Sequence, residues 1–361
     1  MGIDTTEIDH LIAAVGASRS IFQSAAWIKT LIETAPLASN INAHLLADEG
    51  AGYFLGIEVG RTPKAIGPRR AWFNESGNTS LDGVYPEYNG LLGRTSNVSV
   101  NQSDRAIMAC LDSLSADYPD IDEFVFRNMV DGFAETAKAF AETRDLAFVP
   151  FVEQQTYVID LAALRDQDIS HVESVGRSTR AKIRKSIRHF EEAGPLKIER
   201  ADSIEARRSF FSELIDLHNQ VWRSRGQEGA FDADLVKSFH HRFTERYPLH
   251  SDLFRITSGE NVVGMLYNFR EGLRAYNYQS GFSYEGVSGL VPGYVCHSLA
   301  ADYYAKEGLQ TYDLLGGGDH YKERLAKPGE RLISFSLARK NWRWRLLSGV
   351  KNVKSALKRS S

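Results

Sequence analysis

Four arginines recur at helical spacing in one short stretch of the chain. Arg177, Arg180, Arg184 and Arg188 are three, four and four residues apart, so a helix places them along one stripe. Like charges on one stripe repel, and the planar guanidinium group binds phosphate through two parallel hydrogen bonds. The stripe therefore predicts contact with an anion, and we expect Arg180 and Arg184 to face a cleft between domains. The anion is either a phosphorylated substrate or acidic residues of the N-terminal half; the plainer alternative is a solvated helix face.

A glycine-rich turn between a β-hairpin pattern and a helical pattern is the second feature. Two alternating runs, 261–270 and 272–282, are joined at Glu271-Gly272 and read as paired antiparallel strands. The turn 286–293 leads into a helical pattern over 294–306. Backbone N–H groups and the helix dipole at such a junction attract an anionic group. The residues predicted to bind the anionic part of a cofactor or co-substrate are Ser288, Gly289, Leu290, Val291, Gly293 and Tyr294.

Other chemistries are poorly supported. The run 286–290 misses the Gly-x-Ser-x-Gly pattern of hydrolases because position 290 is leucine. His240 and His241 are adjacent, so they point to different helix faces and make a poor metal pair. We expect no metal site and no permanently bound cofactor. Cys110 and Cys296 are the only cysteines of the sequence, which favours free thiols and a reducing compartment.

Length and pattern predict two α/β domains followed by a basic tail. A chain of 361 residues suggests two domains of roughly 150 residues each. We place them at 1–155 and 156–340, and the tail at 341–361. Helical patterns cover 20–35, 102–115, 132–143, 176–194, 204–223, 234–246 and 294–306. Strand patterns cover 43–46, 53–58, 69–73, 123–128, 146–151, 196–199, 253–257, 261–270, 272–282 and 332–338.

The charge distribution sets expectations about partners and location. A net charge of −3 predicts no general affinity for DNA or other nucleic acid. Residues 339–361 carry eight basic residues and no acidic one, and apolar residues recur on one helical stripe of this tail. The tail predicts an amphipathic helix packed on the body, with peripheral contact to a membrane or an acidic partner as the alternative. Without a signal-peptide pattern or a run of about 18 apolar residues, the expected location is the cytoplasm, including the inner-membrane surface.

Several motifs in one order carry a resemblance to a known family. They are the basic helix 177–192, the run Leu217-His-x-x-x-Trp-x-x-Arg-Gly226 with Phe231, the turn 288–293, and Asp313-x-x-Gly-x-x-x-x-Tyr-Lys322. Together they resemble the acetyltransferase domain shared by CelD-type cellulose-biosynthesis proteins and related to FemAB-type aminoacyl transferases. The resemblance covers roughly 157–340. Two weaker family-like motifs precede it, Phe22-x-Ser24-x-x-Trp27 and Pro86-Glu-Tyr-Asn89.

The resemblance implies two GNAT-type folds in tandem, each a mixed, mostly antiparallel sheet flanked by helices. It also implies an acyl thioester donor, with acetyl-CoA as co-substrate, and an amine or hydroxyl acceptor. The strand at 274–282 would pair with the pantetheine arm, and the turn 288–293 would hold the pyrophosphate. That turn departs from the usual GNAT pattern Arg/Gln-x-x-Gly-x-Gly/Ala. Aminoacyl-tRNA, the donor of Fem-type relatives, therefore stays open as the alternative.

Acyl transfer of this kind requires two oriented substrates, removal of a proton from the nucleophile and stabilisation of the oxyanion. The residues that the resemblance brings forward are Asp313 and His218 as bases, Tyr321 and Tyr278 as acids, Lys322 and Arg225 as charge stabilisers, and Trp222 beside the substrate. Each has a plainer interpretation. His218 and Trp222 would be core packing, Asp313 a turn cap, Tyr278 a cross-strand packing residue and Lys322 a surface charge.

The function that follows is acetylation of a sugar, polysaccharide or cell-envelope precursor, the acceptor being a small molecule or glycan that carries phosphate. A Fem-type aminoacyl transfer to a peptidoglycan precursor is the alternative among enzymes. Outside catalysis, the alternative is a scaffold that keeps the fold and docks on a polysaccharide-synthesis complex through its basic tail.

Overall fold

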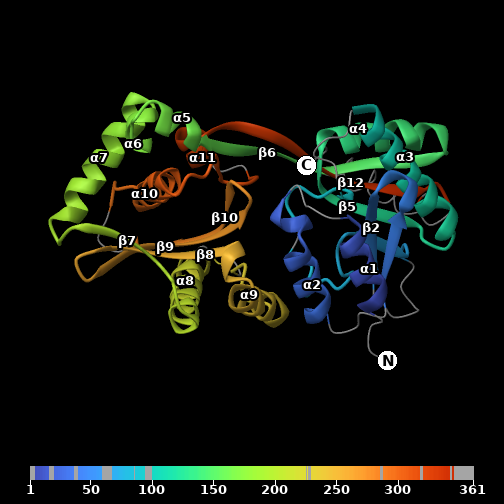
Figure 1. The fold of residues 1–361 in the computed structure, drawn as a ribbon, viewed down its shortest axis with the longest axis horizontal. Coiled ribbons are helices and arrows are strands. Elements are labelled where there is room, and N and C mark those ends of the chain that lie inside the picture. The colour runs from blue at the N-terminus through green and yellow to red at the C-terminus, as the bar shows by residue number, and fades with distance from the viewer. Residues whose placement is uncertain are drawn as a thin grey trace, which may run out of the picture. The chain divides into compact units, whose positions relative to one another are not determined.

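The computed structural model describes residues 5–15, 20–35, 40–58, 67–84, 86–93, 100–224, 226, 229–284, 288–317, 320–341 and 344. The chain folds into two compact units (Figure 1). Unit 1 comprises residues 1–153 and 331–361, and unit 2 comprises residues 154–330. The boundaries fall within strands β6 (Leu146–Asp160) and β12 (Lys327–Arg339). The sequence boundary at 340 placed the strand at 332–338 in the second domain, but β12 pairs with β5 (Glu123–Val130) and so completes unit 1.

Unit 1 is a mixed sheet covered by helices. Its strands run in the order β1-β2-β3-β5-β12, and only β3 and β5 pair in parallel among these neighbours. The remaining strand bounds are β1 (Ile41–Leu46), β2 (Ala51–Ile57), β3 (Arg70–Phe73) and the short β4 (Leu92–Gly93), which pairs with β2. The helices are α1 (Thr5–Val15), α2 (Ala25–Thr34), α3 (Val100–Asp117) and α4 (Asp131–Thr143), with 3-10 turns at Ile21–Gln23 and Ala47–Glu49.

The core of unit 1 lies between the sheet and helices α3 and α4. Tyr53, Phe73 and Phe126 of the strands are fully buried there with Cys110 of α3 and Phe140 of α4. Burial of such large side chains stabilises the unit by about 1.5–3 kcal/mol each. Helix α1 packs on the opposite face, where the Leu11 side chain closely approaches Gly52, a position without room for a Cβ atom.

Unit 2 has the sheet order β6-β11-β10-β9-β8-β7, in which β10 and β11 form the parallel pair and their neighbours are antiparallel. The strands are β7 (Leu196–Arg200), β8 (Ser251–Ser258), β9 (Asn261–Glu271), β10 (Arg274–Phe282) and β11 (Thr311–Asp313). The β9–β10 hairpin turns at Gly272, whose φ of 56° suits glycine, as the sequence predicted.

The helices of unit 2 cover both faces of this sheet (Figure 1). One face carries α5 (Leu161–Asp166), α6 (His171–Ser174), α7 (Arg177–Glu191), α10 (Pro292–Lys306) and α11 (His320–Leu325). The other carries α8 (Ile204–Ser224), α9 (Asp234–Arg246) and the 3-10 turn Pro248–His250. Helices on both faces of a mixed, mostly antiparallel sheet confirm the predicted fold class.

No helix among the described residues is both long and apolar enough to span a bilayer. Residues 342–343 and 345–361 lie outside the described part, so the amphipathic tail helix stays a prediction.

Candidate functional site

Strands β10 and β11 separate to form a fork in unit 2. They pair only from Arg274 to Tyr276 on β10 and from Thr311 to Asp313 on β11. Beyond this point β11 ends, while β10 continues to Phe282. The β10 register shifts between Asn277 and Gln279, which marks a β-bulge at Tyr278 and increases the local twist of the strand. Beyond Tyr276, this edge of β10 therefore has no β11 partner among the described residues of unit 2.

The turn that ends β11 is held by Asp313. Its carboxylate accepts a hydrogen bond from the Leu315 N–H at 2.7 Å and forms an ion pair with Arg274 Nη2 at 2.6 Å. Leu315 is buried with a φ of 61°, a left-handed conformation that is rare for a bulky residue. Asp313 itself is fully buried. The structure thus gives Asp313 the turn-capping contact that the sequence left open, and both carboxylate oxygens are occupied.

His218 is fixed by hydrogen bonds on both sides of its ring. Nδ1 lies 3.2 Å from the Ser280 carbonyl oxygen, and the Ala230 N–H donates to Nε2 at 3.2 Å. A ring that donates from Nδ1 and accepts at Nε2 is neutral, and burial lowers the pKa of His218. The imidazole therefore ties α8 to the open end of β10. Trp222, half-buried one turn later, lies 5.8 Å from it between ring centroids.

The other predicted catalytic residues lie on different faces of the sheet. Tyr278 packs against His240 and Phe269, with ring centroids 4.9 Å away from both, on the face covered by α8 and α9. Tyr321 of α11 lies on the opposite face. Lys322 is 6% exposed and donates to the Gly316 carbonyl oxygen, so it is a buried cation rather than a surface charge. Arg225 lies outside the described residues.

The glycine-rich turn enters α10 as the sequence predicted. Pro292 is the first helical residue, and Gly289 has the positive φ of 73° that favours glycine. The Val291 N–H donates to Ser186 Oγ of α7 at 3.1 Å, so the basic helix holds this turn from the side. A Cβ atom at Gly293 would lie 3.0 Å from the Phe282 ring. The turn therefore sits directly above the end of β10.

The arginines of α7 line a hollow of about 550 Å³ within unit 2. Its described lining residues are Arg177, Arg180, Ala181, Arg184 and Arg188. None of these arginines forms an ion pair among the described residues. Arg180 is half-buried; its Nη2 donates to the Val175 carbonyl at 3.2 Å, while its buried Nε has no partner.

Among the described residues, Glu173 is an acidic side chain on which this stripe acts, and the effect is small. Hydrogen bonds from the Ser170 N–H and hydroxyl lower the pKa of Glu173, with smaller contributions from Arg184 and Arg180. That carboxylate serves the capping box of α6. The stripe is therefore a concentrated positive surface without a matched acidic partner in the part of unit 2 that the structure describes. That Arg180 and Arg184 face a cleft between domains stays a prediction.

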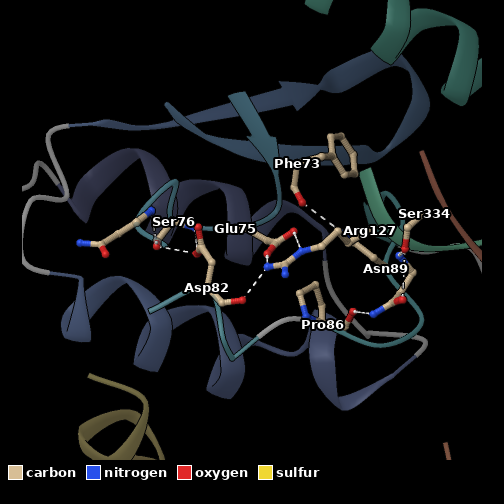
Figure 2. Close-up of polar contacts among 10 residues, drawn as sticks. Phe73, Glu75, Ser76, Asp82, Pro86, Asn89, Arg127 and Ser334 are labelled. Carbon is tan, nitrogen blue, oxygen red and sulfur yellow. Dashed lines mark hydrogen bonds and ion pairs between the residues drawn. The ribbon is translucent and has the colours of Figure 1, made fainter. Parts of the chain in front are cut away.

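A second buried polar cluster lies in unit 1 (Figure 2). Glu75 and Arg127 form an ion pair in which both carboxylate oxygens are engaged, and Arg127 also donates to the Asp82 carbonyl at 2.6 Å. Asp82 Oδ1 accepts from the Ser76 N–H and hydroxyl at 2.9 and 2.6 Å, whereas its buried Oδ2 has no partner. Burial raises the pKa of Asp82 to about 6.

The two N-terminal motifs meet beside this cluster. Asn89 donates to the Phe73 carbonyl, and Asn128 of β5 donates to the Pro86 carbonyl and contacts Ser334 (Figure 2). Gln23, within the first motif, donates to the Tyr88 carbonyl at 3.2 Å. Ser24 caps α2 by accepting from the Trp27 N–H at 3.1 Å. The motifs thus build the interior of unit 1.

Sequence reasoning missed the polar residues that line the fork on its α10 face. Asn277 and Ser280 of β10 are hydrogen bonded to each other at 3.2 Å, and His297 of α10 is fully buried close by. A polar residue inside a helical or strand pattern carries no signal of its tertiary neighbours, so only the structure could find them. No group of three or more His, Cys, Asp or Glu side chains suited to a metal ion occurs in the described ranges.

Residues 177–323 match the acetyltransferase (GNAT) domain family. Solved structures with the same fold include FemX, 13% identical with a TM-score of 0.58, covering 93% of this chain and 96% of that one. The C-terminal domain of a putative lysylphosphatidylglycerol synthetase from Agrobacterium fabrum is 11% identical with a TM-score of 0.53, covering 97% and 96%. L-PGS from Bacillus licheniformis is 12% identical with a TM-score of 0.51, covering 94% and 93%. No curated protein matches the chain in sequence.

The matched residues lie within unit 2, which therefore holds a GNAT-type acyltransferase domain, and the solved structures share the fold of nearly the whole chain.

Proposed function

We propose that the chain transfers an acetyl group from acetyl-CoA to an amine or hydroxyl group of a phosphorylated sugar or cell-envelope precursor. The observation that carries the donor assignment is the fork between β10 and β11, which opens within the stretch that matches the acetyltransferase domain. The free edge of β10 offers backbone groups to the amides of a pantetheine arm. The turn before α10 and the N-terminal end of that helix then accept the diphosphate.

The acceptor assignment rests on the arginine-lined hollow. Guanidinium groups bind phosphate oxygens in pairs, and about 550 Å³ accommodates a diphosphate with part of a sugar. Arg180 carries a buried Nε without a partner, which leaves that donor for a ligand. The proposal also includes a cytoplasmic location and contact with the inner membrane through the basic tail, because both are consistent with an acceptor of this class.

A Fem-type aminoacyl transfer is the second candidate. It is favoured by the likeness in fold to FemX and to two lysylphosphatidylglycerol-synthetase structures over nearly the whole chain, and by a turn at 288–293 that departs from the usual GNAT pattern. The two candidates differ in the donor, so ligand binding separates them.

The donor is tested by thermal unfolding with acetyl-CoA, CoA or uncharged tRNA. A ligand at a concentration of 100 times its dissociation constant stabilises the native state by about 2.7 kcal/mol. For a unit of this size, that raises the melting temperature by roughly 5–10 °C. The proposal expects this rise with both thioester and free CoA. A rise with tRNA and none with CoA would transfer the assignment to aminoacyl transfer.

The acceptor site is tested with Arg180→Gln/Arg184→Gln, using UDP-N-acetylglucosamine as the probe in calorimetry. The control is Lys182→Gln/Lys185→Gln, which removes the same charge from the same helix at exposed positions outside the hollow. We expect the arginine pair to weaken binding roughly tenfold or more at low salt, and less at high salt. CoA binding should stay nearly constant. Equal losses in both double variants would reduce the stripe to a general charge effect and overturn its role as a site.

A further inference from the structure

A chain of buried hydrogen bonds crosses unit 2 beneath α10 and begins at a carboxylate. Asp252 of β8 is 2% exposed, and its Oδ2 accepts from the Tyr304 hydroxyl at 2.9 Å. Arg200 and Arg270 lie 3.8 and 3.7 Å from its oxygens. Burial raises the pKa of Asp252, and the two guanidinium groups oppose that rise. The Tyr304 hydroxyl is the donor in this hydrogen bond, so its proton points to Asp252.

The direction of every later hydrogen bond follows from this first one. The Tyr304 oxygen receives the Asn268 Nδ2–H at 3.1 Å, which turns the Asn268 Oδ1 the other way. That oxygen accepts from Asn277 Nδ2 at 2.9 Å and from the Tyr312 hydroxyl at 3.4 Å. We assign the Tyr312 proton to Asn268 Oδ1, so that the Tyr312 oxygen accepts from His297 Nδ1, which lies 3.1 Å away. His297 is therefore the Nδ1–H tautomer, with a lone pair on Nε2.

This lone pair is buried and has no hydrogen-bond partner. His297 is fully buried, and burial, Lys322 and His171 lower its pKa to about 3, so the ring is neutral in the physiological range. Phe282 at the end of β10 and Tyr321 of α11 flank the ring, with centroid distances of 5.8 and 5.7 Å. The unused acceptor thus lies at the fork, where a buried polar atom without a partner costs stability unless a ligand binds it.

Two other buried histidines show what a purely structural role looks like. His171 has partners on both ring nitrogens, Ser298 Oγ at 3.0 Å and the Leu325 carbonyl at 2.8 Å. His240 also has an Nε2 without a partner, but it belongs to α9, a helix on the opposite face of the sheet, and it packs against Phe231 and Tyr278. The rings of Phe239 and Tyr267 stand nearly perpendicular to it. Only His297 of these three combines an unused nitrogen with a position at the fork.

We propose that His297 Nε2 accepts a hydrogen bond from a neutral amide N–H of the bound acyl donor, and that this contact selects a pantetheine thioester. The inference rests on the proposed acetyl-CoA-dependent function. An aminoacyl ester would instead present an α-ammonium group, and the buried Lys322, whose charge already acts on His297, repels a second cation. A pantetheine arm carries uncharged amides and meets no such repulsion. His297 thus binds the donor, while Tyr312 is a positioning residue that fixes the tautomer.

The test compares CoA dissociation constants for the wild type, His297→Asn and His297→Gln by calorimetry, with His240→Asn as the matched control. Asparagine fills the Nδ1 position but falls short of Nε2, whereas the glutamine amide oxygen reaches close to it. We expect His297→Asn to weaken CoA binding roughly tenfold or more, the size typical for loss of a buried acceptor. His297→Gln should stay within about threefold of the wild type. His240→Asn should lower the melting temperature and leave CoA affinity within about twofold.

A second readout remains decisive even where a variant fails to fold. In wild-type protein with ¹⁵N-labelled histidine, the Nε2 resonance of His297 should show an unprotonated nitrogen and shift when CoA saturates the protein. This inference fails if wild-type protein binds CoA without that shift, or if His297→Asn binds CoA as tightly as the wild type. The proposed function would stand in either case. If wild-type protein does not bind CoA at all, the proposed donor and this inference both fail.

Discussion

Replacing Asp82 by Asn isolates one titrating group in the interior of unit 1. Asp82 is 5% exposed, and burial raises its pKa from an ordinary value of 3.8 to about 6. The native state therefore binds this proton more tightly than the unfolded chain does. The stability contributed by protonation is fully present below about pH 3.8 and is lost as the pH rises through about 6. At about 1.36 kcal/mol for each pH unit, the loss between pH 4 and pH 7 is about 2 kcal/mol.

Asp82→Asn keeps an acceptor for the Ser76 N–H and hydroxyl but cannot ionise. We expect its stability to match that of the wild type near pH 4 and to exceed it by about 2 kcal/mol at pH 7. Urea unfolding from pH 4 to 7.5, followed by tryptophan fluorescence and circular dichroism, measures the difference. Trp27 is buried in unit 1 and reports on its unfolding.

The control is Asp120→Asn, a carboxylate of unit 1 whose side chain is 81% exposed beside Arg69. At each pH, the free energy of unfolding of this variant should stay within a few tenths of a kcal/mol of the wild-type value, because exposed ion pairs contribute little. Parallel profiles for Asp82→Asn and the wild type, or lower stability of the variant at pH 7, would refute the assignment of a raised pKa to this buried carboxyl.

Two further variants test the fork itself. Asp313→Asn should lower the stability of unit 2 by about 2 kcal/mol, because it removes the carboxylate that pairs with Arg274. Turnover of the folded protein should change less than tenfold. A hundredfold loss of turnover at an unchanged melting temperature would instead support Asp313 as the general base. Gly293→Val should weaken CoA binding and lower the free energy of unfolding by about 1–3 kcal/mol, because its side chain meets the Phe282 ring. The control Gly132→Ala of α4 has open space around its Cβ, so it should leave CoA binding unchanged and should not lower stability, since alanine favours a helix over glycine. CoA affinity unaffected by Gly293→Val would move the diphosphate site away from this turn.

Local signals in the sequence predicted the elements well. Alternation and the Glu271-Gly272 turn located the β9–β10 hairpin, and helical spacing over 20–35 located α2. The helix α7 begins after Gly176 and ends before Gly194, as its spacing indicated. These features depend on residues close together in the chain, where propensity, periodicity and capping act directly.

The site was less accessible because its contacts are tertiary. Nothing near Asp313 in the sequence points to Arg274, which reaches it only because β10 and β11 pair in parallel. The helical pattern at 294–306 shows His297 as one polar residue among apolar ones, without its link through Tyr312 to Asp252. Likewise, the contact of Ser186 with the Val291 N–H depends on how α7 packs beside α10. Such partners follow from topology, which sequence periodicity does not encode.

The fork depends on two local distortions, one on each strand. On β10, the bulge at Tyr278 changes the register, so Asn277 and Ser280 both reach the α10 face. On β11, the Asp313 carboxylate holds Leu315 in a left-handed conformation that is otherwise unfavourable by about 1–3 kcal/mol. That contact ends the parallel pairing and turns the chain away, while Arg274 fixes the carboxylate at the last paired position. Asp313 therefore shapes the fork through its contacts with Leu315 and Arg274 rather than by moving a proton, which is why we expect Asp313→Asn to lower stability more than turnover.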